Sequence, residues 1–124
     1  MDTNIDIPDQ FIHANPLPII KVKGTHLEIG RQIGEAFRNQ IQHHITNTQE
    51  LIRLTYKTLE LDWAGARMQG RKYLPFAQER FPKYVEEMAG MSEGANVELD
   101  DLGVVNALEA VTMDALHLSK CTSL

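Results

Sequence analysis

Apolar residues recur at helical spacing along most of the chain. An apolar residue returns every four positions at Ile29, Ile33, Phe37, Ile41 and Ile45. The apolar side continues, with some drift, through Ile52, Tyr56 and Leu59. Such spacing keeps side chains on one side of an α-helix. It predicts one long amphipathic helix, bent at residues 46–48, where weaker helix formers gather.

The start of this helix has a recognisable signal. The sequence THLE from Thr25 is a capping box, in which the Thr25 hydroxyl and the Glu28 carboxylate each accept a hydrogen bond from the other residue's backbone N–H. Gly30 and Gly34 follow one turn apart, and each costs up to ~1 kcal/mol relative to alanine inside a helix. Because a closely packed backbone would offset that cost, we expect another element to pack here.

Two further helices are predicted downstream. Asp62 is placed to cap a second helix that runs through Lys72 and is broken or kinked at Pro75. Pro82 suits the first position of a third helix, and Gly94 suits its C-cap.

A fourth helix is predicted to begin at Asp100 or Asp101. Its apolar side is formed by Leu102, Val105, Leu108, Thr112 and Leu116. No internal repeat or domain-scale linker interrupts the chain. The sequence therefore predicts a mainly α unit of about four helices at residues 19–124, preceded by a proline-rich extended arm at residues 1–18.

One short segment departs from the helical pattern. Residues 19–23, with the sequence IIKVK, alternate in part and are rich in β-branched side chains, which predicts a strand closed by Gly24. A single strand leaves its backbone groups unpaired. Either this strand is irrelevant to the fold, or its sheet lies elsewhere.

Composition and charge narrow the function classes. The 124 residues are 43% hydrophobic and 23% charged, which is typical of a globular domain, and the net charge is −5. This balance disfavours nucleic-acid binding, which needs a concentrated positive surface. The N-terminal sequence lacks the pattern of a secretory signal, and no apolar run approaches the ~18 residues of a membrane helix. With one cysteine and no disulfide framework, the chain is predicted to be cytoplasmic.

The histidines and glycines do not predict a cofactor or metal site. His43 and His44 are adjacent, so on a helix they point about 100° apart and are better explained as solvated surface residues. The glycines match neither the phosphate-binding loop nor the dinucleotide-binding pattern. No cofactor and no metal are expected.

The single cysteine, Cys121, is the main candidate for chemistry. Asp114, His117 and Cys121 are spaced so that a continuous helix would place them on one face, as an acid, a base and a thiol. Residues 120–123 look more extended than helical, and a helix surface offers no oxyanion hole. The alternative is a small buried hydrophobic residue, which describes most free cysteines.

Three segments occur in an order typical of a known enzyme family. They are GTHLEIGRQIG at 24–34, FPKYVEEMAGMSEGA at 81–95 and CTS at 121–123. Their order and spacing resemble the N-terminal segment of the acyl-coenzyme A:6-aminopenicillanic acid acyltransferase family. This is the cysteine peptidase group C45, within the N-terminal-nucleophile hydrolases.

The resemblance implies a role for each residue around the cysteine. Cys121 would be the nucleophile and would form an acyl-thioester with an acyl-amide or acyl-coenzyme A substrate. Self-cleavage between Lys120 and Cys121 would free an α-amine that serves as general base. The hydroxyls of Thr122 and Ser123 would bind the nucleophile or the developing oxyanion. The family's αββα sandwich and its β-chain would complete the site, and the isolated chain would be nearly inactive.

Two alternatives to this interpretation stay open. A family member that cleaves itself has glycine before the cysteine, whereas Lys120 stands here, so a related amidase without self-cleavage is one alternative. The other is a helical interaction module without enzymatic activity.

Overall fold

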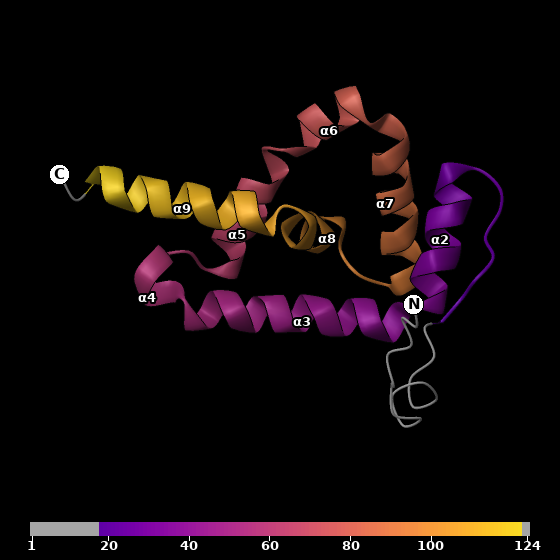
Figure 1. Cartoon of the computed structure of the whole chain (residues 1–124), viewed down its shortest axis with the longest axis horizontal. Helices are drawn as coiled ribbons and strands as arrows, with labels where there is room; N and C mark the ends of the chain where they lie inside the picture. Colours follow the sequence, from indigo (N-terminus) through magenta and orange to yellow (C-terminus); the bar gives the residue numbers. More distant parts are fainter. Residues whose placement is uncertain (1–17, 123–124) are drawn as a thin grey trace, which may run out of the picture.

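The computed structural model describes residues 18–122, which form a helical assembly (Figure 1). Its helices are α2 (His26–Ala36), α3 (Arg38–Leu54), α4 (Tyr56–Leu59), α5 (Trp63–Arg71), α6 (Leu74–Arg80), α7 (Pro82–Ala95), α8 (Leu99–Asn106) and α9 (Leu108–Thr122). The predicted helical character is confirmed. The predicted arm lies, except for Pro18, outside the described residues.

The strand predicted at residues 19–23 is wrong. These residues have no regular secondary structure, and a side chain from α2 satisfies part of their backbone. The Lys23 N–H donates to Gln32 Oε1 at 3.2 Å, and Gln32 Nε2 donates to the Lys23 carbonyl at 2.8 Å. Gln32 thus replaces a neighbouring strand at this residue. The αββα architecture is contradicted as well, because residues 18–122 contain no sheet.

The first long helix is real but not continuous. The capping box at Thr25 is present as predicted. The helix breaks at Phe37 (φ −114°, ψ 26°) and again at Thr55, rather than near residues 46–48. Figure 1 shows α3 running across the end of the α2–α7 pair, in a direction that a straight extension of α2 could not take.

The break at Phe37 places two side chains of α3 at the C-terminus of α7. Arg38 Nε donates to the Gly94 carbonyl at 3.1 Å, and Gln42 Nε2 donates to the Ala95 carbonyl at 2.8 Å. The last carbonyls of a helix have no partner within that helix. The turn at Phe37 therefore brings in the two side chains that donate hydrogen bonds to the last carbonyls of α7.

Helices α2 and α7 pack backbone against backbone through four glycines. A Cβ atom on Gly30 would overlap the Glu87 carbonyl of α7, and one on Gly34 would overlap the Met91 carbonyl. Gly90 and Gly94 of α7 contact the α2 backbone in the same way. The element predicted to pack against the first two glycines is thus confirmed as α7.

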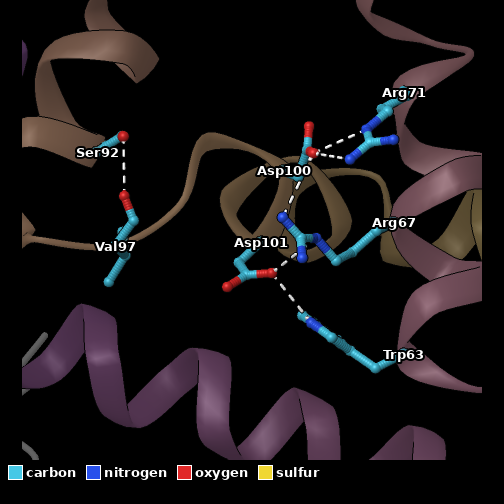
Figure 2. Close-up of polar contacts among 7 residues, drawn as sticks. All are labelled: Trp63, Arg67, Arg71, Ser92, Val97, Asp100 and Asp101. Carbon is cyan, nitrogen blue, oxygen red and sulfur yellow. Dashed lines mark hydrogen bonds and ion pairs between the residues drawn. The ribbon is translucent and has the colours of Figure 1, made fainter.

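The end of α7 differs from the prediction for the same reason. Gly94 is not the C-cap, because it is used for close packing inside the helix. Asn96 ends the helix instead, in the left-handed conformation (φ 56°) that asparagine tolerates better than most residues. Just beyond it, the Ser92 hydroxyl donates to the Val97 carbonyl at 2.9 Å (Figure 2).

The remaining helix boundaries mix confirmed and corrected predictions. Asp62 caps α5 by accepting a hydrogen bond from the Gly65 N–H at 2.8 Å, and Pro82 is the first residue of α7, both as predicted. Pro75 does end the preceding helix, but it also lies in the first turn of a separate helix, α6. The predicted fourth helix is split at Ala107 into α8 and α9.

Two apolar clusters hold the helices together. One lies where α9 meets α5 and α8; its buried members are Ile52, Leu61, Ala66, Val104, Val111 and Ala115. The other joins α3, α7 and α8 through Ile45, Met88 and Leu102. Trp63 packs against both clusters.

Candidate functional site

Cys121 lies near the end of α9, which is continuous from Leu108 to Thr122. The extended backbone predicted at residues 120–123 is therefore wrong for Lys120, Cys121 and Thr122. Ser123 lies outside the described residues. A partly apolar sequence from Leu108 onward propagates the helix through the cysteine without a glycine or proline to end it.

The N-terminal half of α9 is anchored in the core. Val111 and Ala115 are buried against the cluster that includes Ile52 and Val104. Figure 1 shows the helix, in yellow, starting beside α8 and extending away from it toward the C-terminus. The apolar anchor thus determines the direction in which the backbone at Cys121 lies.

Asp114 is engaged by a partner that the sequence did not reveal. The Tyr73 hydroxyl, from the connection between α5 and α6, donates to Asp114 Oδ2. This hydrogen bond raises the pKa of Tyr73, and partial burial adds to the effect. The carboxylate predicted as the acid of a helical triad therefore connects α9 to α5 and α6.

The most extensive polar network among the described residues joins α5 to α8 (Figure 2). Arg71 donates to Asp100 Oδ2 from Nε at 2.7 Å and lies 2.5 Å from it through a terminal nitrogen. Arg67 donates to the same oxygen at 3.4 Å. Trp63 Nε1 donates to Asp101 Oδ1 at 3.0 Å.

The charges in this network are balanced. The hydrogen bond from Arg71 is the main reason that the pKa of Asp100 is lowered, and it raises the pKa of Arg71 in turn. Arg67 Nε lies 3.3 Å from Asp101 Oδ1, an ion-pair distance, but it lacks hydrogen-bond geometry to any acceptor. Two paired carboxylates and two guanidiniums provide a clamp between helices rather than a free base.

Sequence reasoning missed this clamp, although a signal was present. Arg67 and Arg71 stand four residues apart, and Asp100 and Asp101 stand side by side at a helix start. Each pair is an ordinary solvated arrangement on its own. Only the packing of α5 on α8 brings them together.

No metal centre is found in the part of the chain that the structure describes. His43 and His44 are exposed on α3, and no group of three potential ligands occurs among the described residues. In the same part of the chain, the helices are too short or too polar to cross a membrane.

The sequence has detectable similarity to one kind of enzyme. It is 28% identical over 101 residues to the beta-alanyl-dopamine/carcinine hydrolase of Drosophila melanogaster, a match that covers 82% of this chain and 26% of the relative. The chain thus spans about a quarter of the length of that relative. No family model and no solved structure matches the sequence. The similarity is to a hydrolase.

Proposed function

We propose that this chain is part of a longer cysteine-dependent amide hydrolase of the C45 type, with Cys121 as its nucleophile. Similarity to a hydrolase over 82% of the chain is the observation that carries the proposal. The order of the motifs at residues 24–34, 81–95 and 121–123 also supports it. The first two motifs are the paired helices α2 and α7, so they contribute to the scaffold.

The proposed reaction follows ordinary thiol chemistry. The Cys121 thiol gives its proton to a base, and the thiolate sulfur attacks the amide carbonyl. The C–N bond breaks, the amine leaves with the proton, and an acyl-thioester remains. Water then attacks the thioester carbonyl, which releases a carboxylic acid and restores the thiol. An amine in place of water would make the same enzyme an acyltransferase. Thr122 and Ser123 are the proposed hydroxyl donors beside the sulfur.

The helical backbone favours the form of this enzyme that does not cleave itself. Self-cleavage needs the Cys121 sulfur to attack the Lys120 carbonyl at a distorted peptide bond. Regular helix geometry holds this peptide unstrained, so the last turn of α9 would first have to open. Intact mass of the longer polypeptide distinguishes the two forms, because self-cleavage separates it between Lys120 and Cys121.

The name of the relative suggests the first substrates to test. It is described as acting on β-alanyl-dopamine, in which an acyl group is joined to an amine. We propose an N-acylated amine as the substrate class. The remainder of the longer protein is the proposed partner of this chain, and it would supply the substrate pocket.

The test measures amine release from β-alanyl-dopamine by the longer polypeptide. Cys121→Ala is expected to lower kcat/KM by at least ~100-fold, because the alanine side chain has no sulfur to form the thioester. His43→Ala, at an exposed residue of α3, is the matched control and keeps full activity. Activity that survives Cys121→Ala would overturn the proposal.

A second candidate is a helical interaction module without catalysis. The two apolar clusters and the glycine-packed pair α2–α7 favour it, since they give this chain a core of its own. A monomer with sharp thermal unfolding would favour the module. Aggregation of the 124-residue chain would favour the enzyme portion.

A further inference from the structure

A cavity of about 210 Å³ lies between α6, α7 and α8, next to the end of α5. Leu74, Val85, Met88 and Leu99 give it apolar walls, and Tyr73 and Tyr84 line it as well. In Figure 1, α6 lies above α8 and α7 lies to its right, whereas the C-terminal end of α9 lies at the far left. The cavity is unrelated to the residues assigned to amide hydrolysis.

A glycine without a packing reason helps to keep this space open. Gly103 of α8 lines the cavity, and a Cβ atom added to it would meet no atom within 4 Å. Its φ angle is not positive, so glycine is not required by the backbone. It still costs up to ~1 kcal/mol relative to alanine within the helix. The packed glycines of α2 and α7 recover that cost through close contact, whereas Gly103 does not.

The polar groups around the cavity are already paired with one another. Asp100 at its edge is neutralised by Arg71 and Arg67. The Tyr84 hydroxyl donates to Asn106 Oδ1 at 3.4 Å, and the Tyr73 hydroxyl donates to Asp114. The charges in the lining thus compensate one another, so the cavity offers an uncharged ligand apolar contacts without an excess charge.

We propose that this cavity binds a small uncharged aromatic molecule. Its volume exceeds the ~150 Å³ of an engineered apolar cavity that binds benzene, so a six-membered ring with a short substituent fits. The two tyrosines offer ring contacts, which add to the burial of apolar area. Saturated molecules of the same size gain only the free energy of burying apolar area, without the ring contacts.

This site does not depend on the role of Cys121. Ala107, at the edge of the cavity, directly precedes α9, and the continuous helix from Leu108 to Cys121 rises about 20 Å. A small molecule in the cavity therefore does not reach the cysteine along α9. The proposal stands whether or not the thiol is a nucleophile.

Fluorine NMR with 4-fluorobenzyl alcohol as the probe tests the proposal on the longer polypeptide and on the 124-residue chain. We expect saturable broadening of the probe signal, and at least tenfold weaker binding to Gly103→Leu, whose side chain occupies the cavity. Gln78→Leu is the matched control, because Gln78 is exposed on α6 and does not line the cavity. It should bind within twofold of the unsubstituted chain. Circular dichroism verifies that both variants are folded.

Three outcomes would overturn the proposal. The first is the absence of saturable binding to the unsubstituted chain. The second is equal binding by Gly103→Leu. The third is binding that occurs in the 124-residue chain but is lost in the longer polypeptide, which would show that a protein segment is the natural occupant.

Discussion

At the scale of single residues, Asp100 shows how neighbours determine the behaviour of a side chain. Its side chain is about a quarter exposed and accepts hydrogen bonds from two arginines. These donors stabilise the charged form and so lower its pKa from the ordinary value of 3.8. The contribution to folding is present above pH 3.8 and is lost as pH falls through the lower pKa of the folded state.

Asp100→Asn is therefore expected to lower the free energy of unfolding by about 1 kcal/mol at pH 7, a value reduced for the exposure of Arg71. It should also weaken the loss of stability below about pH 4, because the substituted residue no longer titrates. Urea unfolding between pH 3 and pH 7 measures both effects. Glu50→Gln, in the exposed pair with Arg53, is the control and should change stability less. Equal effects of the two variants would contradict this account.

At the scale of secondary-structure elements, the glycines separate into two functional kinds. Gly34 lets α2 approach the α7 backbone, whereas Gly103 faces open space in α8. Both stand inside helices, and the sequence alone does not distinguish them.

Gly34→Ala is expected to destabilise the chain by roughly 1–3 kcal/mol, because α2 and α7 must separate to admit the methyl group. Gly103→Ala should instead stabilise it by up to ~1 kcal/mol, since alanine favours the helix and meets no neighbour. Thermal unfolding, monitored by circular dichroism, shows whether the melting temperature of each variant falls or rises relative to the unsubstituted chain. A destabilising Gly103→Ala would show that the cavity is closed in solution.

At the scale of the whole molecule, Ile52 of α3 links the first half of the chain to the last. It is 1% exposed and lies in the cluster that also holds Leu61, Val104 and Val111. Loss of its side chain would leave a void among helices α3, α5, α8 and α9.

Ile52→Ala is expected to lower the free energy of unfolding by about 2–5 kcal/mol. Leu54→Ala is the control, because Leu54 is 66% exposed in the same helix and should cost much less. Urea denaturation followed by tryptophan fluorescence reports on the shared core through Trp63. Similar losses for the two variants would mean that α3 does not pack as described.

Local rules predicted the starts of helices better than their continuity. Thr25, Asp62 and Pro82 act where the sequence places them, because a cap or a proline acts within one turn. The breaks at Phe37 and Ala107 were missed, since no residue there opposes a helix strongly. The change of direction at Phe37 is stabilised by contacts between α3 and the end of α7, which lies more than 50 residues away in the sequence.

The candidate site divides in the same way. The role of Cys121 is a prediction from its sequence context alone, whereas the hydrogen bond between Tyr73 and Asp114 joins residues 41 positions apart. Sequence patterns likewise did not predict the clamp between α5 and α8 or the cavity beside α7. A pattern describes one helix at a time, whereas both features depend on how helices pack together.

The sequence by itself determined the helical character, the capped helix starts and the glycine-spaced segments, because those depend on contacts within a few residues. The tertiary structure alone decided where helices turn, which glycines pack and which remain beside open space. It also decided that residues 19–23 form no strand, since Gln32 supplies hydrogen bonds to Lys23 in place of a neighbouring strand. These outcomes depend on contacts between elements that are distant along the chain. In each case, the packing of backbone groups and the pairing of polar groups between helices determined the result.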